Sequence, residues 1–431
     1  MTGPGRAVPT LLLDQAGDDE RLLAACPTDL AGHRRRHPRP PAPGRQPDPD
    51  LLDAIERSGL TGRGGAGFPT AQKLRAVGAA RGPRVVVVNG AEGEPASGKD
   101  RVLLTHAPHL VLDGAVVAAA AVGAARVVVC VDRSQPEALA AIRTALAERA
   151  AESDGAAWQV AASPSRYVTG QSSAIVQWLG GGPAVPTGVH AHQRGVDGRP
   201  TLVQNVETLA HLALVASQGP AWFRSLGTVD EPGTTLVTVT GAVARPSVVE
   251  VALGSPVPDI IRRAGGSSEP LQALLIGGYF GTWVDARAGL QARYSRAGLA
   301  PLGAGPGAGV VIALPATACG VAETARVLAW FAGESAGQCG PCAFGLPALA
   351  TAAAELARGA AGPAEVDRLR RWAGEIEGRG ACRHPDGATA LLRSALTVFA
   401  ADVEAHAGGA PCAGSSRPPA LRVPAPGEGW R

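Results

Sequence analysis

The stretch that decides the fold is VVVVNGAEGEPASGKDR, residues 85–101. Its first part, Val85–Asn89, is a run of four valines that ends in an amide, which is typical of a parallel strand buried on both faces. A loop that contains Glu92, Glu94 and Lys99 follows directly. Ligands bind beyond the carboxyl ends of such strands, so this loop is either a ligand site or a solvated charged turn.

Helical and strand patterns alternate on both sides of this strand. Helices are expected at 51–58, 110–125, 135–152 and 173–179, and further strands at 126–132 and 158–162. A βαβαβ order predicts a parallel sheet that is covered by helices on both faces. The sequence therefore predicts an α/β domain over residues 49–228.

The pattern changes near residue 230. Two strand patterns, at 234–243 and 247–253, flank a Gly/Pro turn and open a small α+β module over residues 229–318. Four amphipathic helical patterns follow over 319–406 and predict a helical bundle. The two ends, 1–48 and 407–431, are rich in Pro or Gly, and we expect both to be disordered.

Composition argues against several classes of protein. The 431 residues carry a net charge of only +3, which gives no electrostatic case for a nucleic-acid partner. The start has no signal-peptide pattern, and the most apolar stretch, 111–131, contains glycines and an arginine, so we expect a cytoplasmic protein with no membrane span. Only Lys73 and Lys99 are lysines among 40 basic residues, which marks these two ammonium groups as candidates for a tight site.

A glycine run precedes the valine strand. Gly62, Gly64, Gly65 and Gly67 satisfy G-x-G-x-x-G, but the dinucleotide fingerprint needs a strand before it and here a helical pattern precedes it. Glycines can still wrap a phosphate or a flavin with backbone N–H groups, and a helix that begins near Thr70 would favour an anion. The run is therefore a cofactor loop or a plain turn.

Two further loops carry groups that suit a flavin or a nicotinamide. Tyr167 and Gly170 follow the third strand pattern, and Gln204 and Asn205 stand just before a helical pattern. Amides can hold the polar edge of such a ring, although each of these residues can also serve as a structural cap.

A cysteine pair with ligand spacing, Cys339 and Cys342, is followed 40 residues later by Cys382. Zinc, a redox dithiol and an iron–sulfur cluster all remain open for a C-x-x-C pair of this kind. Ala336 occupies the place where one more thiolate would extend the run.

Taken together, the segments resemble the flavin-bearing F-type subunit of bacterial NADH:quinone oxidoreductase (complex I) and its relatives in NAD-linked hydrogenases and formate dehydrogenases. The motifs that carry the resemblance are SGLTGRGGAGFPTAQKL, NGAEGEPASGKDR, YVTGQSSA, LVQNVETLA and ESAGQCGPC with a distant Cys382, collinear over residues 50–405. The resemblance implies a Rossmann-like FMN-binding domain, a ubiquitin-like β-grasp domain and a four-helix bundle that holds a [4Fe–4S] cluster. It also implies that NADH passes a hydride to FMN and that single electrons leave through the cluster.

The resemblance implies a set of cofactor-binding residues. They are Gly62, Arg63, Gly64, Gly65, Gly67, Lys73, Asn89, Glu92, Tyr167, Gly170, Gln204 and Asn205. Glu92 is also the expected catalytic group, and Gln204 stands where the family usually has Asn.

Departures from the family pattern concentrate on the contacts to NADH. Where the family has carboxylates, this chain has Ala91, Gln171 and Ser172. Where the family has aromatic rings, it has Ala76 and Val185, and only the ring of Phe68 is kept. Each lost contact of this kind costs about 1–3 kcal/mol. We therefore expect FMN to be held and NADH to be bound poorly or not at all.

The resemblance also implies a cluster motif C-x2-C-x2-C with one distant cysteine, of which Cys339, Cys342 and Cys382 remain as the expected metal ligands. Candidates for the fourth ligand are His384, Ser335, Cys319 or a partner protein. Zinc or no metal are the alternatives to a three-cysteine cluster. Cys26, Cys130 and Cys412 are expected to be core or tail residues.

The sequence thus favours a flavin and iron–sulfur electron-transfer subunit that works in a small complex outside complex I. The expected partners are a ferredoxin-like or thioredoxin-like redox subunit, or a membrane cytochrome that would hold the chain at the inner face of the membrane. A genuine NADH dehydrogenase subunit and a non-redox scaffold protein are the two alternatives.

Overall fold

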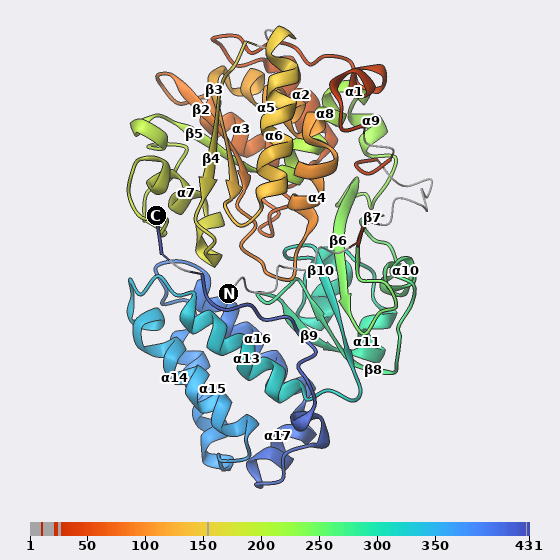
Figure 1. Ribbon diagram of the computed structural model, residues 1–431, viewed down its shortest axis with the longest axis vertical. Coiled ribbons are helices and arrows are strands. Elements are labelled where there is room, and N and C mark those ends of the chain that lie inside the picture. Colours follow the sequence, from red (N-terminus) through yellow and green to blue (C-terminus); the bar gives the residue numbers. More distant parts are fainter. Residues whose placement is uncertain (1–9, 12–20, 25–26, 153–154, 428) are drawn as a thin grey trace.

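The computed structural model describes residues 10–11, 21–24, 27–152, 155–427 and 429–431. Figure 1 shows a sheet flanked by helices at one end of the molecule, a second sheet at its side and a group of helices at the other end.

The first sheet has four parallel strands. Their order is β4 (Ala157–Ser163), β3 (Ala124–Asp132), β2 (Arg84–Gly90) and β5 (Thr201–Asn205). The parallel α/β sheet is therefore confirmed, and β5 is a strand that the sequence patterns did not reveal. All four carboxyl ends reach the same edge, which faces the rest of the molecule in Figure 1.

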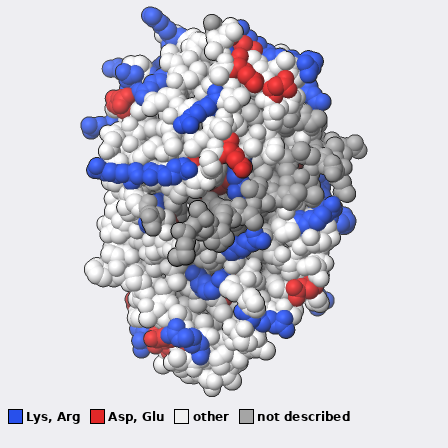
Figure 2. All heavy atoms as spheres, in the orientation of Figure 1, with Lys and Arg blue, Asp and Glu red and all other residues white. Residues whose placement is uncertain are grey.

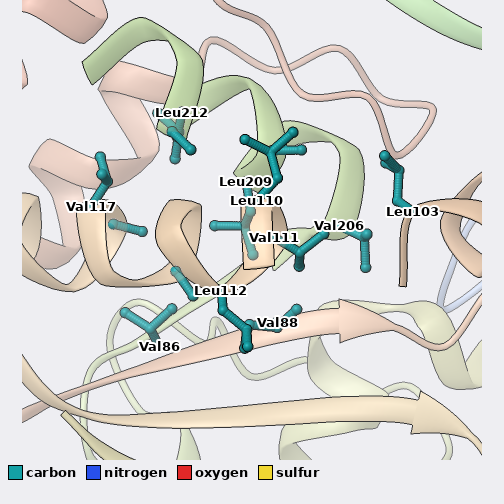
Figure 3. Packing of buried hydrophobic residues seen from close by; sticks show 14 of the residues in the cluster. Val86, Val88, Leu103, Leu110, Val111, Leu112, Val117, Val206, Leu209 and Leu212 are labelled. Carbon is teal, nitrogen blue, oxygen red and sulfur yellow. The ribbon is translucent and has the colours of Figure 1, made fainter. Parts of the chain in front are cut away.

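Helices cover both faces of this sheet. They are α2 (Pro49–Ser58), α3 (Thr70–Gly78), α4 (Lys99–His106), α5 (Pro108–Val122), α6 (Pro136–Arg149), α7 (Ser172–Leu179), α8 (Val206–Gln218) and α9 (Pro220–Phe223). All 15 residues of α5 are buried, and Figure 3 shows Leu112 packed over Val86 and Val88 of β2 while Leu209 of α8 lies on the other side of α5.

The described residues contain no single helix that is long and apolar enough to cross a membrane. By length and composition alone, α4 and α5 would pass that test together, but they meet at a bend of 98°.

The second sheet is mixed and has six strands in the order β1-β7-β6-β10-β8-β9. The strands are β1 (Thr10–Leu11), β6 (Thr234–Gly241), β7 (Ser247–Ala252), β8 (Leu271–Ile276), β9 (Thr282–Asp285) and β10 (Val310–Pro315). Strands β6 and β7 pair antiparallel, as the Gly/Pro turn between them predicts. Short helices α10 (Val257–Arg263), α11 (Ala286–Gln291) and α12 (Arg296–Leu299) accompany this sheet.

Helices form the C-terminal region. They are α13 (Gly320–Gly333), α14 (Leu346–Ala357), α15 (Pro363–Ile376), α16 (His384–Val398) and α17 (Ala400–Ala407). The last of the four helical patterns breaks at Phe399, so that it gives two helices, α16 and α17.

The prediction of a disordered arm over residues 1–48 is wrong for the described part of that segment. Helix α1 (Leu30–Arg36) packs against α5 and α6, because two of its side chains bind the buried Asp113 carboxylate. His33 Nε2 and Arg34 Nη1 lie 2.8 and 2.7 Å from Asp113 Oδ2, and Arg149 Nη1 lies 2.7 Å from Oδ1. Cys26 lies outside the described residues.

The prediction of a disordered tail over residues 407–431 is also wrong where the structure describes it. Leu421 is buried, and its N–H group and that of Ala420 donate to Glu323 of α13. The tail then returns to the first sheet, and the C-terminus lies beside α7 in Figure 1. The tail is ordered because its backbone N–H groups bind the Glu323 carboxylate, a partner that the composition of the tail does not reveal.

Candidate functional site

Two asparagines mark the centre of the carboxyl edge of the first sheet. Asn89 of β2 and Asn205 of β5 are register partners at their strand ends. Asn89 Nδ2 donates to Gly170 O at 2.8 Å, and Asn205 Nδ2 donates to Asp100 Oδ2 at 2.6 Å. The loops after β2, β4 and β5 are thereby fixed around one point, with Gln204 buried beside Asn205.

The glycine loop, residues 62–67, reaches the same edge. A Cβ on Gly64 would lie 3.3 Å from Asn205 Cβ, so the loop packs against the end of β5. Gly65 and Gly67 have φ of 100° and 58°, which other residues adopt only with strain. The glycines therefore allow the backbone of this loop to pack closely against the end of β5.

Arg63 is predicted to bind the cofactor, but its side chain is engaged elsewhere. The guanidinium donates to the carbonyl oxygens of Thr61, Pro232 and Thr234, at 3.0–3.2 Å. Two of these acceptors precede or open β6 of the second sheet, so Arg63 joins the two sheets. The expectation of a cofactor contact through this side chain is not supported by its position.

Lys73 on α3 lies in a site that suits an anion. Its Nζ donates to Val203 O of β5 at 2.5 Å, and burial lowers the pKa of this ammonium to about 8. Among the described residues no carboxylate pairs with it, and the buried hydroxyl of Thr70, at the start of the same helix, has no hydrogen-bond partner there either. A phosphate would satisfy both groups next to the glycine loop.

Lys99, the other lysine, is paired with two carboxylates of the protein itself. Its Nζ lies 3.0 Å from Asp100 Oδ1 and 2.9 Å from Glu207 Oε2, and Glu207 Oε1 accepts the N–H of Leu236 in β6. Burial raises the pKa of Asp100 to about 7. Lys99 therefore stabilises the junction with the second sheet, and Lys73 is the lysine that is available to a ligand.

A cavity of about 310 Å³ opens beside this edge, between the loops after β2, β3 and β4, the helix α13 and the tail. Glu92 lines it. Its Oε1 accepts from the Ser97 hydroxyl and from Asp100 N, whereas its buried Oε2 finds no partner in the described part of the chain. This oxygen is a buried, unpartnered atom of the residue that the sequence predicts to be catalytic.

Tyr167 connects this edge to the helical region. Its N–H donates to Glu334 Oε2 at 2.7 Å, and its ring centroid lies 5.2, 5.3 and 5.5 Å from those of Trp330, Phe331 and His384. Burial raises the pKa of the phenol well above its usual value, so the hydroxyl keeps its proton. The ring is thus a continuous contact between the sheet edge and helices α13 and α16.

Glu94 gives a testable pH dependence. Its carboxylate accepts from Tyr279 N and Ala96 N, yet burial raises its pKa to about 7 from an ordinary value of 4.5. The folded state therefore holds a proton that the unfolded state releases between these pH values.

The stability that this proton provides is complete below about pH 4.5 and is lost as pH rises through about 7. The melting temperature of the parent relative to Glu94→Gln should therefore fall as pH is raised across this window. The exposed Glu269→Gln is the matched carboxylate control. If the melting temperature of the parent rises relative to that of Glu94→Gln as pH is raised, the pKa of Glu94 is not raised in the folded state.

The three predicted metal ligands come together in the helical region. Burial raises the pKa of the Cys342 thiol to about 12, a hydrogen bond with Ser335 opposes this shift, and the nearby Cys339 and Cys382 add to it. Buried thiols of this kind become good ligands only beside a strong positive charge. Three thiols with one hydroxyl beside them fit an iron–sulfur cluster that has three cysteine ligands.

The structure distinguishes the candidates for the fourth ligand. His384 Nε2 donates to Phe331 O at 2.9 Å, which leaves the lone pair on Nδ1, a buried nitrogen with no partner in the described part of the chain, so His384 stays a candidate. Cys319 lies with His406 and Cys412 and belongs to another cluster of side chains. Ser335 is the candidate that the structure places beside Cys342.

The tail contributes to the cavity, which sequence reasoning missed. Gly427 N donates to Glu334 Oε1 at 2.6 Å, and its carbonyl accepts from Arg166. The Arg166 guanidinium lies 3.9 Å over the Trp430 ring, and Ala184 N donates to Trp430 O at 2.7 Å. A lone Trp in a Gly/Pro-rich segment is too weak a signal to predict this contact.

Comparison with known proteins agrees with these three regions. Residues 55–214 match the Nuo51 FMN-binding domain, 236–277 match the SLBB domain, and 322–406 match the NADH-ubiquinone oxidoreductase-F iron-sulfur binding region. The fold and the site thus define a flavin and iron–sulfur oxidoreductase.

Curated relatives cover most of the chain. It is 30% identical to the NADH-quinone oxidoreductase F subunit 2 of Rhizobium meliloti, over 83% of this chain and 88% of that protein. It is also 30% identical to the NADH-quinone oxidoreductase F subunit of Mycobacterium tuberculosis, over 85% and 86%. The chain belongs to the family of NADH-quinone oxidoreductase F subunits.

Solved structures of an NAD+-reducing [NiFe]-hydrogenase share the fold. The air-oxidized state matches with a TM-score of 0.81 and 30% identity, over 95% of this chain and 69% of that one. The H2-reduced state matches with a TM-score of 0.77 and 32% identity over 83% of this chain, which spans 62% of the hydrogenase chain.

Proposed function

We propose that this chain accepts electrons from a two-electron donor at an FMN site on the carboxyl edge of the first sheet. It then delivers them to a [4Fe–4S] cluster held by Cys339, Cys342 and Cys382, and from there to a partner redox subunit. The observation that carries the proposal is the position of Tyr167. Its ring touches Phe331 and also His384, two residues beyond Cys382, so one side chain links both cofactor regions.

Each part of the FMN site has a defined task in this proposal. Lys73, Thr70 and the backbone N–H groups of the glycine loop bind the phosphate. Bound FMN supplies the conversion between electron pairs and single electrons. The other predicted cofactor residues, Asn89, Tyr167, Gly170, Gln204 and Asn205, surround the remaining part of the site. Glu92 takes up or releases the proton through its unpartnered Oε2.

In this proposal the three regions are three domains. Residues 49–228 form the Rossmann-like FMN-binding domain, 229–318 a β-grasp domain and 319–406 the iron–sulfur bundle. The parallel sheet, the mixed sheet with its short helices, and the helices α13–α17 support this division. The bundle has four helices if α16 and α17, which follow each other across the break at Phe399, are taken as one.

NADH is a poor donor for this site. The positions at which the family has carboxylates carry Ala91, Gln171 and Ser172, and the aromatic positions carry an exposed Ala76 and a buried Val185. The tail supports the same conclusion, since it lines the cavity beside Glu92 and places an aromatic ring on Arg166. A dinucleotide that enters there has to displace it.

The partner is proposed to be a ferredoxin-like or thioredoxin-like redox subunit, or a membrane cytochrome that holds the chain at the inner face of the membrane. Figure 2 shows charged side chains scattered over one face of the molecule, most of which is uncharged. Phe344, which is 78% exposed and lies two residues from Cys342, offers an apolar contact next to the cluster.

The test is the visible spectrum of the anaerobically purified chain with dithionite or with one equivalent of NADH. We expect flavin and iron–sulfur absorption that dithionite bleaches and NADH leaves unchanged over minutes. A second protein without residues 424–431, with Ala91→Asp, Gln171→Glu and Ser172→Glu, should gain NADH-dependent bleaching. The same deletion without the three substitutions is the matched control.

Each of the other outcomes overturns part of the proposal. Rapid bleaching of the parent protein by NADH would make the chain a genuine NADH dehydrogenase subunit. A colourless protein that takes up neither FMN nor iron on reconstitution would make it a non-redox scaffold.

A further inference from the structure

A second group of metal-ligating side chains lies apart from the cysteines of the iron–sulfur region. The ligand atoms of Cys319, His406 and Cys412 all lie within 4.8 Å of one another, and Cys319 Sγ is 3.4 Å from His406 Nε2. Cys319 is the N-terminal cap of α13, His406 lies in α17, and Cys412 follows α17 in the tail. Three separate segments thus converge on one point.

His406 is oriented as a ligand. Its Nδ1 lies 3.2 and 3.1 Å from the carbonyl oxygens of Leu356 and Ala357, so this nitrogen carries the proton and donates it. Nε2 then holds the lone pair and faces Cys319. Histidines that bind metals show the same arrangement, in which the second ring nitrogen donates to a backbone carbonyl.

In the structure, the lone pair of His406 Nε2 accepts a backbone hydrogen bond, which is weaker than a bond to a metal ion. Cys412 N donates to His406 Nε2 at 3.1 Å. A cation between the three ligand atoms would take the place of this hydrogen bond after a small movement of the backbone at Cys412.

The packing of the tail keeps the three donors together. A Cβ on Gly414 would lie 2.6 Å from the carbonyl carbon of Ala318, so only glycine permits the tail to press so closely on the start of α13. Cys319 and His406 are buried, whereas Cys412 is half-buried. A cation can therefore reach the group from the side of the tail.

We propose that Cys319, His406 and Cys412 bind a zinc ion. Two thiolates and one imidazole are preferred zinc ligands, and the two thiolates neutralise its charge. Water fills the fourth position on the open side of Cys412. The ion fastens the tail to α13, and so fixes the start of the segment that leads to the cavity.

The experiment uses the full chain purified with its cofactors, with metal content and zinc K-edge X-ray absorption as readouts. We expect about one zinc per chain, with Zn–S near 2.3 Å and Zn–N at about 2.0–2.1 Å in a two-to-one ratio. Cys412→Ser and His406→Gln should lose this zinc. Cys130→Ser, at a buried thiol of β3, is the matched control and should keep it.

Cys382→Ser separates the two metal sites, since it should lose iron and keep zinc. Because Cys319 caps a helix, Cys412→Ser in the half-buried tail is the decisive variant. Equal zinc in Cys412→Ser and the parent would overturn the proposal. So would a Cys319–Cys412 disulfide in the unreduced protein, or a parent that holds no zinc after incubation with zinc and gel filtration.

Discussion

Replacing Lys73 by Gln should weaken FMN binding about 30- to 100-fold without destabilising the flavin-free protein. Lys73 is half-buried, desolvation lowers the pKa of its ammonium to about 8, and its partner in the structure is a single backbone carbonyl. A charged hydrogen bond to a phosphate contributes about 2–3 kcal/mol, which corresponds to that loss of affinity. The melting temperature of the flavin-free variant should equal or exceed that of the parent, because a buried charge is removed.

Flavin fluorescence titration of the stripped protein, together with thermal unfolding, measures both effects. Arg75→Gln is the matched control, since it removes a cation from the exposed face of the same helix, where the side chain is paired with Asp53 and Glu56. The control should bind FMN like the parent. A Lys73→Gln protein with unchanged affinity would show that the phosphate does not lie at this helix.

Replacing Asp113 by Ala should destabilise the region around the first sheet by about 3–5 kcal/mol, because it removes a buried carboxylate that is shared by Arg34, Arg149 and the His33 ring. Although burial opposes it, hydrogen bonds from His33 and Arg34 and the charge of Arg149 hold the pKa of Asp113 well below its usual value. Hydrogen exchange in residues 30–36 should rise strongly, since α1 loses its main anchor.

Thermal unfolding and hydrogen exchange of the same samples give the result. Asp53→Ala removes an exposed carboxylate from an ion pair with Arg75 and should cost no more than about 1 kcal/mol. If α1 exchanges as rapidly in the parent as in Asp113→Ala, then the arm is disordered in solution, as its composition alone suggests.

The first sheet could be predicted because its main strands are runs of apolar residues with clear boundaries. Strand β5 was missed because TLVQN is short, ends in two amides and runs directly into a helix. Helix α1 was missed for another reason. Its anchor, Asp113, lies 80 residues away from His33, so a Pro- and Arg-rich segment finds its stability in a partner that no local pattern shows.

The candidate site divides in the same way. Asn89 and Glu92 lie at the sheet edge, where strand-end reasoning places them, whereas Lys73 on α3 is predicted from the rarity of lysine and from the family resemblance. Arg63 and Lys99 lie in the right loops, but their acceptors belong to residues near β6 or to Glu207, and the sequence does not reveal which side of a loop a cation will face. Membership of a motif therefore predicted location better than it predicted contacts.

Where it crosses α13, the tail is held largely through its main chain, and the side chain of Leu421 is the buried one. Glu323 and Glu334 stand 11 residues apart, about 16 Å along α13, and both bind backbone N–H groups of the tail, at residues 420, 421 and 427. The main chain of every residue except proline offers such a group. Substitutions at the exposed residues between Leu421 and Gly427 can therefore change what the tail presents to the cavity while its route over the helix stays the same.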